Sequence, residues 1–191
     1  MSPRAAAIAA VTTLVVTAAI LLVVVVPRYY APTATVTPPA ARPAPVAEPK
    51  ITATLYYISE DGLSLVGAKR EVVFGEGTAE QARRIVEAQL TDAPAPLASA
   101  IPAGTTLRSV FVSERGDAFV DLSAEVATKH GGGALDELFT VYAVVNALTV
   151  NLPAISRVQI LVNGKEVDTI AGHVDVRHPL QKNLKWVQGA E

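Results

Sequence analysis

Residues 5–26 are the part of this chain that most constrains what it can fold into. Ala5 to Val26 is a run of 22 residues without a charge, a proline or a glycine. As an α-helix the run would be about 33 Å long at roughly 1.5 Å per residue, and the hydrocarbon core of a bilayer is about 30 Å thick. The run is therefore long enough to span a membrane.

A cleaved signal peptide is the alternative interpretation of this run. Its apolar region is usually only about 7 to 15 residues long and is followed by a small-residue cleavage site. Here Pro27, Arg28, Tyr29 and Tyr30 follow, and tyrosine and arginine are typical of a membrane–water boundary. We therefore predict that residues 1–26 form a cytoplasmic stub and an uncleaved, single-pass transmembrane anchor. The small excess of positive charge before the run favours a cytoplasmic N-terminus and an extracytoplasmic C-terminal domain.

The segment from residue 27 to residue 49 differs sharply in composition. It holds seven of the thirteen prolines of the chain and has neither a helical nor an alternating apolar pattern. Repeated proline favours extended polyproline II at about 3.1 Å per residue, so the segment could reach roughly 70 Å. We predict a proline-rich linker that holds a domain away from the membrane.

From Lys50 onward, extended and helical patterns predict a mixed domain. Extended patterns cover residues 51–58, 63–74, 106–113 and 118–122. The first long helical pattern covers residues 78–90, where Thr78 and Gln81 fit a capping box, and the second begins at Ala134 and is stopped by Pro153. Because hairpins outnumber strand–helix alternations, we predict an α+β fold with a mainly antiparallel sheet and two principal helices packed on one face.

The clearest local signal is a hairpin around Asn163 and Gly164, in the segment SRVQILVNGKEVDTI. Both residues tolerate the positive backbone dihedrals of a type I′ turn. A two-residue turn would pair Val162 with Lys165, Ile160 with Val167 and Val158 with Thr169.

Composition excludes several classes of function. The chain has no cysteine, which removes disulfides, thiolate metal sites and thiol nucleophiles. Residues 50–191 contain 17 acidic and 13 basic residues, an excess of four negative charges. That balance argues against nucleic acid as a partner.

The glycines in KHGGGALDEL, residues 129–138, invite comparison with a phosphate-binding loop. A P-loop needs its lysine after the glycines, but Lys129 precedes them. A dinucleotide loop needs a third glycine where Asp136 stands, and a carboxylate there would repel pyrophosphate. The stretch therefore predicts a hinge before a helix rather than a cofactor site, and we expect no cofactor.

Three polar residues are candidates for ligand binding: Asn146, His173 and Asp175. Asn146 lies within an otherwise apolar helical pattern, where it either bonds to a neighbouring main chain or lines a small polar pocket. His173 and Asp175 could point to the same side of an extended segment, with His178 nearby. No helical H-E-x-x-H pattern accompanies them, so we predict no metal site but keep a small-ligand or metal sensor as an alternative.

Catalysis by paired carboxylates is the other alternative. Glu114, Asp117 and Asp121 could supply the acid and base of a peptidoglycan-directed hydrolase. Charged residues are common beside hairpin turns, however, and the G-x-S-x-G nucleophile motif does not occur. We predict no catalytic residue and no enzymatic activity.

The C-terminal half of the chain resembles a known family. The segment from Gly132 to Leu180 reads GGALDELFTVYAVVNALTVNLPAISRVQILVNGKEVDTIAGHVDVRHPL and resembles the sporulation and spore germination (GerMN) domain of bacterial cell-envelope proteins. Earlier stretches such as LYYISEDGLSLVGAKREV and AFVDLSAEV are also similar. The resemblance implies one GerMN-like domain over residues 50–180, followed by a C-terminal tail over residues 181–191.

The resemblance also implies a function. It implies a non-enzymatic, extracytoplasmic domain used in sporulation, spore germination or envelope assembly. We accordingly expect a binding or assembly module whose partners are an envelope protein or cell-wall component, the membrane through the N-terminal helix, and possible further copies of itself.

Overall fold

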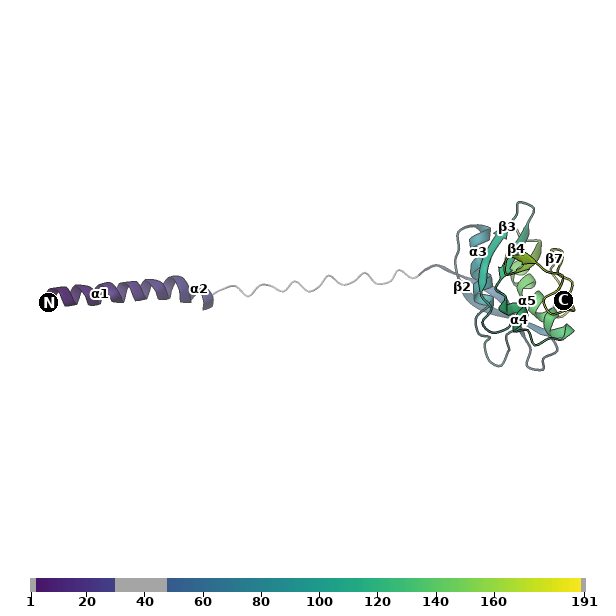
Figure 1. Ribbon diagram of the computed structural model, residues 1–191, viewed down its shortest axis with the longest axis horizontal. Helices are drawn as coiled ribbons and strands as arrows, with labels where there is room; N and C mark the ends of the chain where they lie inside the picture. Colours follow the sequence, from purple (N-terminus) through teal and green to yellow (C-terminus); the bar gives the residue numbers. More distant parts are fainter. Residues whose placement is uncertain (1–2, 30–47, 190–191) are drawn as a thin grey trace. The chain divides into compact units, whose positions relative to one another are not determined.

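The computed structural model describes residues 3–29 and 48–189 and divides into two compact units (Figure 1). The first unit ends at Val46 and the second begins at Ala47. Most of the predicted linker, residues 30–47, lies outside the described residues. The second unit contains a hydrophobic core that runs from Ala53 to Val176, so it is expected to fold on its own.

The first unit is helical but is not one continuous α-helix. Its described residues form α1 (Pro3–Ile20), the π-helical segment η1 (Leu21–Val25) and the short α2 (Val26–Tyr29). The expected transmembrane helix over residues 5–26 is not supported, because no helix within residues 3–29 and 48–189 is both long and apolar enough to cross a bilayer. The change from α- to π-helical hydrogen bonding at Leu21 ends the first helix after 18 residues.

The second unit contains two separate sheets. The smaller sheet pairs β1 (Lys50–Ile58) with β2 (Leu65–Val73) in antiparallel register, with Tyr56 opposite Gly67. The larger sheet has the order β3-β4-β5-β6, with β7 also paired to β5. Its strands are β3 (Leu107–Val112), β4 (Asp117–Leu122), β5 (Arg157–Val162), β6 (Lys165–Glu166) and β7 (Leu180–Gln181).

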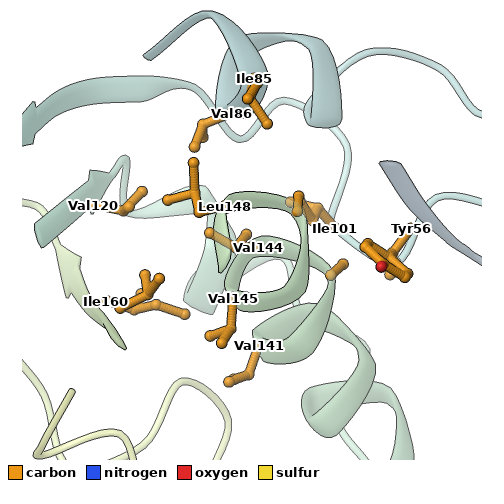
Figure 2. Close-up of a cluster of buried hydrophobic side chains, with 14 of the residues drawn as sticks. Tyr56, Ile85, Val86, Ile101, Val120, Val141, Val144, Val145, Leu148 and Ile160 are labelled. Atoms are coloured by element: carbon orange, nitrogen blue, oxygen red, sulfur yellow. The ribbon is translucent and has the colours of Figure 1, made fainter. Parts of the chain in front are cut away.

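Three helices complete the second unit: α3 (Gly77–Gln89), α4 (Glu125–Thr128) and α5 (Ala134–Asn151). The long helix α5 lies between the two sheets and packs against β1, β5 and α3. Figure 2 shows Val144 and Leu148 of α5 near Ile85 and Val86 of α3, Val120 and Ile160 of the larger sheet on another side, and Tyr56 and Ile101 beyond the helix. Because α5 is covered all round, nearly all of its residues from Phe139 to Leu148 are buried.

The α+β class is confirmed, but the predicted arrangement of one mainly antiparallel sheet with both principal helices on one face is wrong, because the strands form two sheets and α5 packs against both of them. β4 and β5 are parallel, with Val120 opposite Ile160. Parallel neighbours need a long crossover connection, and the chain between these two strands supplies it as α4 and α5.

Side-chain amides explain why β1 does not join the larger sheet. The Tyr56 N–H donates to Gln89 Oε1 at 2.9 Å, and Gln89 Nε2 donates to the Tyr56 carbonyl at 2.7 Å. Asn151 binds the N–H and carbonyl of Thr54 in the same way, at 2.8 and 2.7 Å. Ala98 pairs with Ile58 through main-chain bonds. These bonds occupy the edge of β1, so no further strand can pair there.

Two local predictions need correction. Asn163 and Gly164 do form the positive-φ turn, and Val162 pairs with Lys165. However, β6 ends after two residues, so the predicted pair of Ile160 with Val167 does not form, and Val158 pairs with Leu180 of β7 instead of Thr169. The helix predicted at Thr78 begins at Gly77 without a side-chain cap.

Candidate functional site

Four polar residues of α5 each hold a different segment of the domain. Glu137, Thr140, Asn146 and Asn151 are polar residues on a helix that is otherwise mostly apolar. Each of them binds main-chain groups that are distant in sequence. We call these four residues the α5 clamps.

The Glu137 carboxylate is fully buried and is surrounded by the main chain of residues 170–174. Its Oε1 accepts hydrogen bonds from the N–H groups of Ile170 and Ala171 at 2.7 and 2.8 Å, and its Oε2 accepts one from the N–H of His173 at 2.7 Å. Burial raises the pKa of this carboxyl, but these amides and that of Val174 lower the pKa by more, so it lies below its ordinary value. The carboxylate is therefore ionised and fixes the loop to the start of α5.

Thr140 connects α5 to two loops. Its hydroxyl donates to the Ala100 carbonyl and is 3.1 Å from His130 Nε2. The Gly132 N–H donates to His130 Nδ1 at 3.0 Å, which places the ring hydrogen on Nε2 and makes His130 the donor to Thr140. Gly132 and Gly133 have positive φ values of 84° and 94°. The triple glycine is thus a defined turn, held by the imidazole, that leads into α5.

An open pocket of about 380 Å³ lies where these two loops meet. Its walls come from the segment 99–103, from residues 129–131 and from the first two turns of α5. Ile58 and Ile101 contribute apolar surface, and Lys129 and Asp136 contribute opposite charges. The stretch singled out in the sequence as a hinge therefore also lines a cavity.

Asn146, predicted as a ligand-binding candidate, makes two main-chain hydrogen bonds. Its Nδ2 donates to the Asn183 carbonyl at 2.8 Å and its Oδ1 accepts from the Asn183 N–H at 3.0 Å. These bonds bring the C-terminal tail onto the domain, and Leu65 pairs with Trp186 and Gln188 further along the tail. The structure therefore gives Asn146 a positioning role, and its binding of a ligand stays a prediction.

The structure places His173 and Asp175 in different surroundings. His173 Nδ1 lies 3.3 Å from Glu137 Oε2, so its ring packs beside the buried carboxylate. The Asp175 carboxylate pairs with Arg177 at 2.6 Å, and the guanidinium holds the pKa of Asp175 well below its usual range. No group of three or more potential metal ligands occurs in the described part of the chain. Their predicted ligand binding stays untested.

The carboxylates considered for hydrolysis do not form an acid–base pair. Asp117 accepts two bonds from Arg157, at 2.7 and 3.0 Å. Asp121 accepts from Arg108 at 2.9 Å and from the Gly164 N–H at 2.7 Å. Asp117 and Asp121 lie four residues apart on β4, roughly 13 Å at about 3.3 Å per residue, beyond the about 5 to 9.5 Å that glycosidases use. Glu114 is exposed in the turn before β4.

Sequence reasoning did not find Glu137 or Thr140. A carboxylate in the first turn of a helix is already favoured there by the helix dipole, so the position of Glu137 in the sequence points to no distant partner. Its partners lie 33 to 36 residues away and are main-chain groups. No pattern of side chains in the sequence predicts main-chain partners. The one feature of the sequence that points to Glu137 is a charged residue next to the apolar positions of the helix.

Comparisons with known proteins agree with this fold. A lipoprotein candidate from Clostridium perfringens has a crystal structure that is 24% identical, with a TM-score of 0.51, covering 70% of this chain and 88% of that one. The tandem GerMN domains of the sporulation protein GerM from Bacillus subtilis are 23% identical, with a TM-score of 0.55, covering 70% and 46%. The first GerMN domain of that protein is 21% identical, with a TM-score of 0.51, covering 70% and 96%. At these identities the likeness shows the fold alone.

The family comparison covers most of the second unit. No curated protein matches the sequence. The model of the Germane family, described as sporulation and spore germination, matches residues 54–168, which is more than half of the chain. The matched region runs from β1 to the turn after β6 and so includes the larger part of both sheets and all of α5. The chain is a member of the Germane family of sporulation and spore germination domains.

Proposed function

We propose that this protein is a non-enzymatic binding or assembly module of the bacterial cell envelope that acts outside the cytoplasm in sporulation or spore germination. The observation that carries the proposal is the state of its acidic residues. The buried or nearly buried carboxylates of Glu137, Asp117 and Asp121 are each occupied by main-chain amides or by an arginine. None is left to act as an acid or base, whereas the surface offers groups that suit binding.

The outer face of the larger sheet is the proposed binding surface. Phe111 of β3 is 63% exposed, and its ring centroid lies 6.1 Å from that of Phe119 on β4. Within residues 48–189, β3 pairs only with β4, so no strand occupies its other edge, and α3 packs against β3. An exposed aromatic side chain on an edge strand, packed beside a second aromatic ring, favours a protein partner. We propose an envelope protein as that partner, with a cell-wall component or a second copy as the competing outcomes of the test.

The apolar N-terminal unit is the proposed membrane anchor. Leu14, Leu22 and Val23 are 71%, 69% and 70% exposed. Contiguous apolar surface of this kind needs an apolar environment. The similar Clostridium perfringens protein is described as a candidate lipoprotein, which fits a domain held at a membrane, although this chain has no cysteine to carry a lipid.

Cysteine labelling tests the topology, since the chain has no native cysteine that would interfere. A Glu114→Cys variant places a thiol in the exposed turn between β3 and β4, and Ser2→Cys places one before the apolar run. We expect a membrane-impermeant maleimide to label Glu114→Cys in intact cells and Ser2→Cys only after lysis. Labelling of Glu114→Cys only after lysis would contradict the extracytoplasmic location.

Site-specific photocrosslinking tests the partner. A photoreactive amino acid replaces Phe111 in one strain and Asp92, which is exposed in the loop after α3, in the control strain. We expect an envelope protein to be captured from position 111 and not from position 92. Equal capture from both positions would contradict the proposed surface. Capture of a wall polymer or of a second copy of this chain from position 111 would identify that molecule, and not an envelope protein, as the partner.

Incubation with isolated peptidoglycan tests the absence of enzymatic activity. We expect the purified domain to release no soluble fragments. Release that is abolished by Asp117→Asn, in a variant that remains folded, would refute the non-enzymatic assignment.

A further inference from the structure

The geometry points to a binding site for a small zwitterion, of the amino acid or dipeptide class, in the pocket between the segment 99–103 and the start of α5. This inference does not depend on the proposed assembly role, because it rests on a cavity that lies apart from Phe111 and the outer face of the larger sheet. The pocket volume of about 380 Å³ lies within the range of about 300 to 1,000 Å³ that is usual for small-molecule sites.

The walls of the pocket are fixed by hydrogen bonds. Thr140 is buried in α5 and joins that helix to Ala100 of one wall and to His130 of the other. The His130 ring is held in turn by the Gly132 N–H. One hydroxyl thus connects three wall segments, so a ligand would enter a site that is already formed and would pay little to order it.

Two opposite charges line the pocket, and neither is held in a close ion pair, although the Lys129 ammonium also acts on Glu125 of α4 and lowers the pKa of that carboxyl. Lys129 and Asp136 both line it, and neither makes an ion pair with any residue that the structure describes. The Lys129 ammonium lies against Gly104, where an added Cβ would come within 2.8 Å of Nζ. A side chain at position 104 would therefore displace the ammonium, and glycine leaves it in place beside the pocket.

The remaining lining determines the size and character of the ligand. Ile58, Ala100, Ile101 and Pro102 supply apolar surface, and Ser99 supplies a hydroxyl. Gly131 adds no side chain to the pocket, and a Cβ built there meets nothing within 4 Å. The lining suits a compact ligand with a small apolar side chain.

Charge decides between ligand classes. A simple anion such as phosphate would be attracted by Lys129 but repelled by Asp136. A simple cation would be attracted by Asp136 but repelled by Lys129. A zwitterion satisfies both residues at once, with its carboxylate facing Lys129 and its ammonium facing Asp136.

Titration of the ¹⁵N-labelled fragment 48–191 with alanyl-alanine, followed by amide chemical shifts, tests the site. N-acetyl-alanyl-alanine lacks the ammonium, alanyl-alanine amide lacks the carboxylate, and inorganic phosphate is the simple anion. We expect shifts centred on the amides of Gly131 and Ala103, and an affinity for alanyl-alanine about ten-fold above that of either blocked dipeptide, which corresponds to about 1.4 kcal/mol per charged contact. No binding, or equal binding of N-acetyl-alanyl-alanine or phosphate, overturns the inference.

Charge-removing variants assign the two contacts. Lys129→Gln is expected to weaken alanyl-alanine about ten-fold but to leave the amide-ended dipeptide unchanged, because that dipeptide has no carboxylate to lose. Asp136→Asn is expected to weaken alanyl-alanine and to spare the acetylated form. Lys165→Gln, on the exposed β6 turn, is the matched control. If both dipeptides weaken equally in Lys129→Gln, the assignment of the carboxylate contact is wrong.

A variant that fills the pocket tests the location of the ligand without changing any charge. Gly131→Leu adds a side chain where the backbone has no positive φ and nothing lies within 4 Å, so the fold tolerates it. We expect it to abolish the alanyl-alanine shifts while the amide spectrum elsewhere is unchanged. Retained affinity in a folded Gly131→Leu protein would place the ligand outside this pocket.

Discussion

Replacement of Glu137 by glutamine tests how much of the domain's stability depends on one buried carboxylate. The carboxylate accepts three short main-chain hydrogen bonds, two on Oε1 from Ile170 and Ala171 and one on Oε2 from His173, and the Val174 amide stabilises it further. A glutamine oxygen can replace only one of the two carboxylate oxygens. Its NH₂ group would then face at least one N–H donor, so a buried donor is left unpaired.

The magnitude follows from the separate contributions. An unpaired buried donor costs about 1 to 3 kcal/mol, and each bond that loses its ionised acceptor weakens by about 1 kcal/mol. With one bond lost and two weakened, we expect Glu137→Gln to lower the free energy of unfolding by roughly 3 to 5 kcal/mol. That is a large fraction of the about 5 to 15 kcal/mol that stabilises an ordinary domain.

Urea unfolding of the fragment 48–191 measures this loss, and Glu114→Gln is the matched control. Glu114 is exposed in the β3–β4 turn, so its neutralisation should change stability by about 0.5 kcal/mol or less. Amide hydrogen exchange gives a second, local measurement, because the N–H groups of Ile170, Ala171 and His173 should lose protection before those of β4. If both glutamine variants unfold at the same urea concentration and these amides stay protected, the assigned role of Glu137 is refuted.

The pH dependence has a defined sign. The folded pKa of Glu137 lies below its ordinary value of 4.5, so the folded state holds this proton more weakly than the unfolded state. The stabilisation is therefore complete above pH 4.5 and is lost as the pH falls through the folded pKa. Glu137→Gln should be less sensitive than the wild type to acid in that range, as measured by urea midpoints at successive pH values.

Three further variants test other parts of the structure by urea unfolding. Gln89→Leu removes both bonds to the main chain of Tyr56 and should cost about 2 to 4 kcal/mol, because a buried N–H and carbonyl lose their partners; a loss below 1 kcal/mol would show that water or β1 itself replaces them. Gly164→Ala places a side chain at a φ of 78° and should cost about 1 kcal/mol. Asp175→Ala breaks an ion pair with Arg177 that is more than half exposed on both sides and should leave the urea midpoint unchanged, because solvent screens such a pair; a clear fall in the midpoint would mean that the loop depends on this pair.

Local features of the domain could be predicted from the sequence because their causes are local. Asn163 and Gly164 predict their turn because few residues accept a positive φ, and 52° and 78° are what the structure shows. The apolar spacing of residues 134–149 predicts a helix, which extends to Asn151. In both cases the physical cause lies within a few residues of the effect.

Long-range pairings could not be predicted because their causes are not local. Nothing in the residues of β4 predicts that β5 lies beside it in parallel, since each strand is only a short, mainly apolar run that would fit either direction of pairing. The edge of β1 is closed by Gln89 and Asn151, which lie 33 and 97 residues away from their partners. The pocket beside Lys129 requires the segment 99–103 to fold against α5, and that approach is also long-range.

The α5 clamps suggest why domains of this fold tolerate extensive sequence change, since every clamp binds main-chain groups. Any residue except proline supplies a main-chain N–H. The residue whose N–H is bound can therefore change its side chain with little effect, whereas the clamp residue that binds it cannot. We therefore expect Ala171→Ser to leave stability within about 0.5 kcal/mol of wild type. Ala171→Pro should cost about 1 to 3 kcal/mol, because it removes the N–H that Glu137 Oε1 accepts, and the same variant made on a Glu137→Gln background should cost less than in the wild type. A full proline penalty on that background, measured by urea unfolding as a double-mutant cycle, would show that position 171 matters for its backbone conformation and not for its bond to the carboxylate.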